Sequence, residues 1–191
     1  MTSVDLLTSV WASPAIAHVL VSFGFADGRR LVFSAEIRRE ADEVFSSLGA
    51  FFKKFELILI AVEERDIVKL RTNYRRKNLY LFPLRLSPEQ ARLLLVSYLE
   101  RGNQLAAKPE FYNTITANCT TVVFRLVRLV DTGLPYDWRV LASRYLPSYL
   151  FELGPSIRQS LLAKPLKVRR LRPGQLYSPH PSITPQVFAD S

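Results

Sequence analysis

The sequence predicts an α+β fold, in which an antiparallel sheet comes first along the chain and helices come later. Apolar, strand-like segments occupy the part of the chain before residue 86, and helical spacing of apolar residues begins only after it. The turn sequence ADGR joins the first two strand-like segments, which is typical of a β-hairpin. Strands that precede helices in this way favour the α+β class.

The length and composition indicate one globular domain. The chain has 191 residues, of which 48% are hydrophobic and 23% charged, so wholesale disorder is excluded. Its net charge of +9 is typical of a protein that meets a negative partner, either anionic lipid or nucleic acid. The same net charge is also compatible with an excess of basic residues that only keeps the protein soluble. The scattered basic residues, without regular aromatic interleaving, argue against nucleic acid.

The single cysteine excludes an internal disulfide and any zinc site built from several cysteines. No metal or cofactor is predicted. No apolar stretch reaches the roughly 20 residues that span a bilayer. The N-terminus lacks the basic and apolar regions of a signal peptide.

Four strands are predicted in the first half of the chain. Residues 15–25 and 30–38 form the hairpin, and residues 55–64 are apolar on both faces, as in a central buried strand. Residues 77–86 read as a further strand, and Pro83 favours an edge position for it.

A first helix is predicted from Ser87 to Gly102. Ser87 is the N-cap, Pro88 occupies the first helical position, Gln90 completes a capping box, and Gly102 ends the helix. Its expected buried stripe consists of Ala91, Leu94, Leu95, Tyr98 and Leu99.

Two more helices and a tail follow. A second helix begins at Cys119 and closes at Gly133, and a third, amphipathic one covers residues 137–151 with an interruption at Pro147. Residues 164–191 hold five of the 12 prolines, which predicts an extended, partly disordered basic tail after a domain of residues 1–163.

Cys119 stands where a helix begins, and this position carries chemical information. Asn118 is a good N-cap, which places Cys119 in the first helical turn. Free backbone N–H groups and the helix dipole lower a thiol pKa there, and the same groups can hold an oxyanion. The alternative is a buried small side chain that happens to be cysteine.

The hairpin register brings a histidine to a carboxylate. If residues 26–28 form a three-residue turn, Phe25 pairs with Arg29 and His18 lies opposite Glu36. A two-residue turn would instead place Glu36 on the apolar face, so burial favours the first register. With Cys119, these residues would form a catalytic triad for thiol acyl transfer. An ordinary cross-strand polar pair remains the alternative, because no spacing shows that the helix meets this face.

Four further residues are candidates for substrate binding. Arg71 and Arg75 could hold an anionic head group or a carboxylate, although such residues more often belong to a salt-bridged surface loop. Tyr112 and Asn113 could line the thiol pocket, although a tyrosine before a helix is more often a packing anchor.

Several strings in one order resemble a known family: SPAIAHVLVSFGF, FSAEIRRE, FELILIAVEERDIVKLRTNYR and PEFYNTITANCTT. Over residues 13–154 the chain resembles the Lnb N-terminal periplasmic domain, part of bacterial lipoprotein N-acyltransferases. The resemblance implies a circularly permuted papain-like (NlpC-type) fold. It implies Cys119 as nucleophile, His18 as base and Glu36 as the residue that orients it, with Asn118 shaping the oxyanion site.

The resemblance also implies a function and a place. We expect thiol-dependent acyl transfer or acyl hydrolysis on a membrane lipid or lipoprotein, at the periplasmic or extracytoplasmic face of an anionic bacterial membrane. An amidase or peptidase of cell-wall peptides, and a non-catalytic domain that binds lipid or protein, are the alternatives. The sequence does not determine the oligomeric state.

Overall fold

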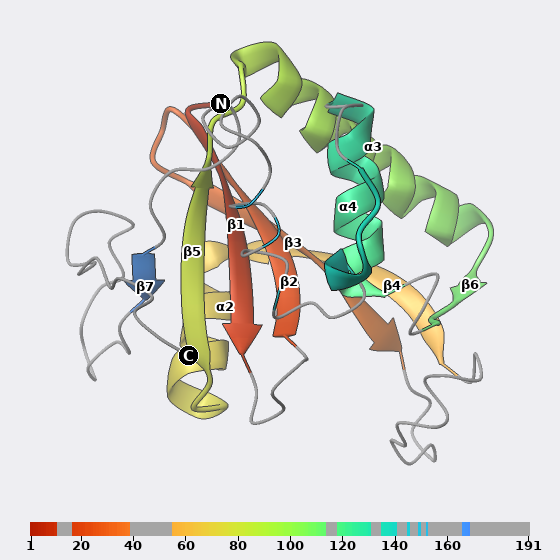
Figure 1. Cartoon of the computed structure of the whole chain (residues 1–191), viewed down its shortest axis with the longest axis horizontal. Coiled ribbons are helices and arrows are strands. Elements are labelled where there is room, and N and C mark those ends of the chain that lie inside the picture. The colour runs from red at the N-terminus through yellow and green to blue at the C-terminus, as the bar shows by residue number, and fades with distance from the viewer. Residues whose placement is uncertain are drawn as a thin grey trace.

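The computed structural model describes residues 1–10, 17–38, 55–113, 118–130, 135–140, 145, 149, 152 and 166–168. Figure 1 shows the arrangement of these elements around one sheet. The predicted α+β class is confirmed.

The described strands form a seven-stranded sheet in the order β6-β4-β3-β2-β1-β5-β7. Every neighbouring pair is antiparallel. The strands are β1 (Ser3–Val10), β2 (Ala17–Gly24), β3 (Arg30–Arg38), β4 (Glu56–Glu63), β5 (Asn78–Leu84), β6 (Glu110–Phe111) and β7 (Leu166–Val168).

Helices cover both faces of the sheet. On one face lie α3 (Pro88–Ala107) and α4 (Cys119–Val130), and on the other lies α2 (Glu64–Lys69), which continues into a π-helix at Leu70–Tyr74 (Figure 1). A 3₁₀ turn at Trp138–Val140 follows α4 along the chain. The two faces of the sheet therefore belong to two separate apolar clusters.

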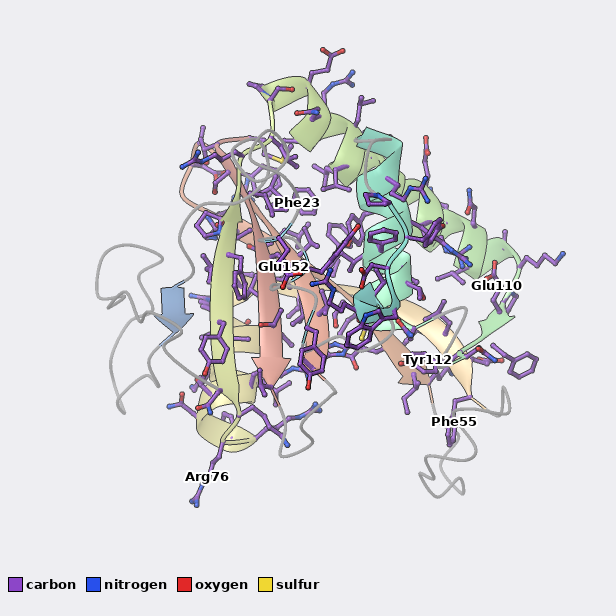
Figure 2. The ribbon with its side chains drawn as sticks, in the orientation of Figure 1. Phe23, Phe55, Arg76, Glu110, Tyr112 and Glu152 are labelled. Carbon is purple, nitrogen blue, oxygen red and sulfur yellow. The ribbon has the colours of Figure 1, made fainter. Side chains whose placement is uncertain are left out.

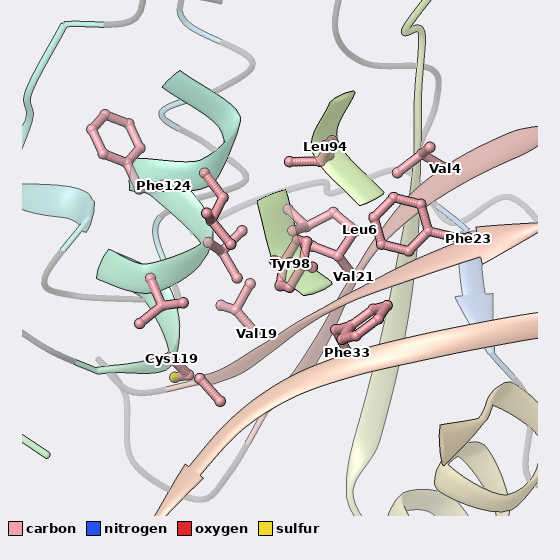
Figure 3. Packing of buried hydrophobic residues seen from close by; sticks show 14 of the residues in the cluster. Val4, Leu6, Val19, Val21, Phe23, Phe33, Leu94, Tyr98, Cys119 and Phe124 are labelled. Atoms are coloured by element: carbon pink, nitrogen blue, oxygen red, sulfur yellow. The ribbon is translucent and has the colours of Figure 1, made fainter. Parts of the chain in front are cut away.

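The larger cluster lies between the sheet and the helices α3 and α4. Phe23 and Phe33 from the hairpin pack against Tyr98 of α3, with ring centroids 5.8 Å and 5.0 Å from the tyrosine ring (Figure 3). Every residue of β2 is buried. Because β2 lies in the middle of the sheet and under α4, it is the best-protected strand.

The predicted hairpin turn is confirmed. Phe25 N–H donates to the Arg29 carbonyl at 2.9 Å, and Gly28 N–H donates to the Phe25 carbonyl at 3.1 Å. Gly28 has φ +82°, which the missing side chain of glycine permits. Leu20 consequently pairs with Ser34, in the register that the sequence favoured.

One strand prediction needs correction, and the strands β1, β6 and β7 were not predicted. The strand β4 is not central, because its outer neighbour β6 covers only two of its residues and most of its side chains are partly exposed. The strand β1, which lies between β2 and β5, was not predicted. The edge position suggested by Pro83 is accurate at that residue, since β7 pairs only with residues 79–81 of β5.

The first predicted helix starts as expected and ends later. The capping box is present, with Ser87 Oγ accepting from Gln90 N–H at 3.1 Å and Gln90 Oε1 accepting from Ser87 N–H at 2.9 Å. The helix passes through Gly102 and ends before Pro109, whose ring restricts the preceding residue to extended backbone. Leu99, predicted to be buried, is 51% exposed.

Two further segments differ from expectation. The charged connection after β4 is not a surface loop but the helix α2 and the π-helix, with Glu64 and Arg71 buried. Within the predicted tail, residues 166–168 pair with β5. Gly133, most of residues 137–151 and the rest of the tail lie outside the described residues.

Candidate active site

Three elements bring the candidate residues together. His18 is the second residue of β2, Glu36 lies on β3, and Cys119 is the first residue of α4. The two strands are hydrogen-bonded neighbours, and α4 packs on both of them. Figure 3 shows Cys119 in the first turn of α4 near Val19, at one end of the packed cluster.

The start of α4 is fixed by its cap. Asn118 Oδ1 accepts from the backbone N–H groups of Thr120 at 2.9 Å and Thr121 at 2.8 Å. In return, Asn118 N–H donates to Thr121 Oγ1 at 2.8 Å. This reciprocal arrangement satisfies helix N–H groups that would otherwise lack partners and holds Cys119 in place.

The His18 ring is held from one side. Its Nε2 lies 2.7 Å from Ser34 Oγ and 2.9 Å from Glu36 Oε1. An imidazole has only two ring nitrogens, so these contacts leave Nδ1 for the thiol. His18 and Cys119 are 8% and 7% exposed, so the pair meets solvent over a small area only.

Burial and charge oppose each other at the thiol and the imidazole. Burial would raise the pKa of Cys119, but the charge and hydrogen bond of His18 outweigh it, and the Val19 N–H and the Thr120 hydroxyl add to the lowering. Burial would lower the pKa of His18, but Cys119 and then Glu36 raise it to about 9. These directions favour a thiolate beside an imidazolium at neutral pH.

The Glu36 carboxyl is kept ionised. Burial would raise its pKa, but hydrogen bonding and charge from His18, then the charge of Arg71 and the Ser34 hydroxyl, bring it to about 2. An ionised carboxylate on Nε2 fixes the imidazole tautomer and stabilises its protonated form.

The structure places the two candidate arginines in different environments. Arg71 is 2% exposed, and its Nη2 donates to Glu36 Oε1 at 2.6 Å, so it belongs to the candidate site. Arg75 is exposed and reaches this group only through long-range charge. The salt-bridged surface loop is therefore wrong for Arg71.

Two tyrosines lie close to Cys119. The Tyr112 hydroxyl accepts a hydrogen bond from the Cys119 backbone N–H, and burial followed by the thiol charge raises the pKa of Tyr112. Figure 2 shows Tyr112 between β6 and the start of α4. Tyr98, which was predicted only as core, has a buried hydroxyl without a partner among the described residues. Burial and then the charge of Cys119 raise the pKa of Tyr98. Asn113 is half-buried next to Tyr112, and its role in a pocket stays a prediction.

Sequence reasoning assigned no role to Ser34, although a signal for it was available. Ser34 lies two residues before Glu36 on the same strand, so the alternation of a strand places both side chains on the His18 face. The contact of the thiol with Val19 N–H had no sequence signal, because it depends on how α4 meets the end of β2.

The described part of the chain also contains a pocket away from the candidate site. A pocket of about 350 Å³ is lined by Asp27, Gly28, Arg29, Arg30, Glu63, Glu64 and Arg65, none of which is a candidate site residue. The described residues contain no group of three or more His, Cys, Asp or Glu side chains placed to hold a metal. No helix in that part of the chain is long and apolar enough to cross a membrane.

Comparison with known proteins identifies the family. The model of the Lnb N-terminal periplasmic domain matches residues 1–144. The chain belongs to this family. The Lnb match begins before the resembling strings and takes in β1, and its name indicates a bacterial, extracytoplasmic setting. No curated protein and no solved structure shows a significant match to this Lnb domain.

Proposed function

We propose that the protein is a cysteine-dependent acyltransferase or acyl hydrolase, on a permuted papain-like arrangement, acting at a membrane surface. The observation that supports it is the Cys119 thiol beside His18, whose Nε2 is held by Glu36. A nucleophile, a base and an orienting carboxylate in this order suit acyl transfer. The Lnb family setting favours a lipid or lipoprotein substrate.

The chemistry follows from the protonation states. The Cys119 thiolate attacks the carbonyl carbon of an ester, and the His18 imidazolium gives its proton to the leaving alkoxide, which departs as an alcohol. The acyl group is then a thioester on Cys119. An amine or water attacks this thioester, His18 takes the proton of the attacking group, and the thiolate leaves.

The oxyanion site is assigned to backbone rather than to a side chain. The Asn118 side-chain oxygen is engaged with the N–H groups of Thr120 and Thr121. The Cys119 N–H faces the Tyr112 hydroxyl, at the position that a substrate oxyanion would take. Asn118 then acts by fixing the first turn of the helix.

Intact mass spectrometry tests this function. Exposure to phospholipid or diacyl lipopeptide is expected to add one acyl mass that neutral hydroxylamine removes, because thioesters react with it. Since the chain has one cysteine, a thioester can form only at Cys119. The Cys119→Ser variant is the control and is expected to show no hydroxylamine-sensitive adduct.

The outcome separates the alternatives. No adduct with lipid esters, together with cleavage of muropeptides, would favour the amidase or peptidase instead. Full turnover of lipopeptide by Cys119→Ser would exclude Cys119 as nucleophile. Slow, unselective iodoacetamide labelling of wild-type Cys119 near pH 6 would favour the non-catalytic domain.

Exposed aromatic rings and a half-buried arginine beside them support the membrane surface as the place of action. Tyr136 and Trp138 are 69% and 63% exposed, and Arg128 stacks on the Tyr136 ring at 4.4 Å. Aromatic rings favour the interface between water and lipid, and basic residues favour anionic lipid. The net charge of +9 acts in the same direction.

We therefore predict that Trp138→Ala weakens binding to anionic vesicles by on the order of tenfold, through loss of interfacial burial. Co-sedimentation with phosphatidylglycerol vesicles measures the effect, and phosphatidylcholine vesicles show how much binding depends on charge. The matched control is Tyr74→Ala, a residue that is 71% exposed on the π-helix. Equal loss in both variants would contradict a specific role for Trp138.

A further inference from the structure

Three hydrogen-bond donors converge on one oxygen of Glu36. The Oε1 atom lies 2.9 Å from His18 Nε2, 2.8 Å from Ser34 Oγ and 2.6 Å from Arg71 Nη2. Ser34 Oγ is also 2.7 Å from His18 Nε2. The three donors come from β2, β3 and the π-helix. The Glu36 carboxylate therefore connects both strands of the hairpin to the π-helix.

The Arg71 side chain is buried and committed to its contact with Glu36. Its guanidinium is 2% exposed, and the one ion pair that it makes among the described residues is with Glu36. A buried cation needs a counterion, and Glu36 supplies it. The Nε atom of Arg71 is buried without a partner within the described part of the chain. The π-helix that carries Arg71 is a rare element that often marks functional sites.

We propose that Arg71 is a positioning residue for the His18–Cys119 pair, acting through Glu36 with Ser34 as a second support. The inference rests on the proposed function in that Cys119 is the nucleophile. Arg71 neutralises part of the Glu36 charge and fixes the carboxylate, and the carboxylate fixes the imidazole with Nδ1 toward the thiol. This role replaces the predicted binding of a substrate anion by Arg71.

The charges around the site indicate the direction of the effect. Glu36 is faced by His18, Arg71 and Tyr112, and the charge of Arg75, just after the π-helix, acts on Arg71. Cys119 is faced by His18, Tyr98, Tyr112 and the Thr120 hydroxyl. Arg71 and the Cys119 thiolate attract each other, so loss of Arg71 removes a charge that favours the thiolate.

The test measures Cys119 alkylation by iodoacetamide, a small neutral reagent, across pH and without substrate. We expect Arg71→Gln to move the acidic limb of the rate profile to higher pH and to slow alkylation about tenfold near pH 6, which corresponds to a shift of about one pH unit. Arg71→Lys keeps the charge but not the planar fork and is expected to recover part of the rate. The matched control Arg75→Gln is expected to follow the wild type.

A double-mutant cycle keeps the proposal testable if Arg71→Gln is poorly folded. Arg71→Gln leaves the Glu36 carboxylate without its cation and Glu36→Gln leaves Arg71 without its counterion, whereas the double variant Glu36→Gln/Arg71→Gln removes both charges of the pair. If Arg71 acts mainly through Glu36, Arg71→Gln is expected to slow alkylation much less in the Glu36→Gln background than in the wild type, where only its direct attraction to the thiolate is left to lose. Additive losses would overturn the proposal.

The outcomes also separate this proposal from the proposed function. A wild-type alkylation profile in Arg71→Gln, with a raised KM only for anionic substrates, would return Arg71 to substrate binding. A shifted profile in a protein that never forms an acyl adduct would keep the positioning role and exclude acyl transfer.

Discussion

Replacing His18 by glutamine is expected to lower acyl turnover by at least about a thousandfold, since loss of the base alone removes most of the catalysis of a triad. The Cys119 pKa should rise as well. Burial is the largest influence on this thiol, and His18 is the main group that opposes it. Without His18, the buried thiol should ionise only above its ordinary range.

Iodoacetamide alkylation across pH checks this expectation directly. Wild-type Cys119 should react at pH 6 to 7, and the His18→Gln variant only at alkaline pH. Ser22→Ala is a suitable control, because Ser22 is also buried on β2 but hydrogen-bonds to Glu64 rather than to the site. Equal profiles in wild type and His18→Gln would contradict the thiolate–imidazolium pair.

The same pair gives a pH dependence of stability. The pKa of His18 is raised from 6.5 to about 9, so its protonated form contributes stability that is fully present below pH 6.5. This contribution is lost as the pH rises through about 9. The difference in unfolding free energy between wild type and His18→Gln should therefore shrink at alkaline pH, as urea titrations at several pH values would show.

Replacing Arg30 by methionine is expected to lower the free energy of unfolding by roughly 3–5 kcal/mol. Arg30 lies at the turn end of the hairpin with a side chain that is 10% exposed, and it pairs with both Asp5 and Glu64. Glu64 is almost fully buried. Methionine fills similar space but removes the cation that both carboxylates contact.

The adjacent arginine offers the matched control. Arg29 pairs with Asp27, but its side chain is 81% exposed, so Arg29→Met should change the urea midpoint little. Adding Asp5→Asn and Glu64→Gln to Arg30→Met should restore part of the lost stability, because the two buried carboxylates that lost the Arg30 cation are then neutral. Similar midpoints for Arg29→Met and Arg30→Met would show that the buried pairs contribute little.

The parts of this fold that local chemistry determines could be predicted from the sequence. The turn at Gly28 sets the hairpin register, and the register sets which residue lies opposite His18. The capping box at Ser87 and the cap at Asn118 are equally local. Each depends on groups within a few residues of one another.

The parts that depend on tertiary packing could not be predicted in the same way. The sequence of β4 is apolar enough for a central strand, but its place beside the two-residue β6 is set by the strand order. The segment from Glu64 to Tyr74 reads as a charged loop, because its buried charges are matched by partners on distant strands. Gly102 is compatible with a helix end, and only Pro109 imposes one.

The central position of β2 has a consequence for thermal inactivation. A strand that is shielded along its whole length opens last, so its amide protons should be among the slowest to exchange with solvent. The His18 imidazole, which is carried by β2, therefore keeps its position as long as the rest of the domain is folded. Loss of thiol reactivity on heating should therefore coincide with the cooperative melting of the whole domain.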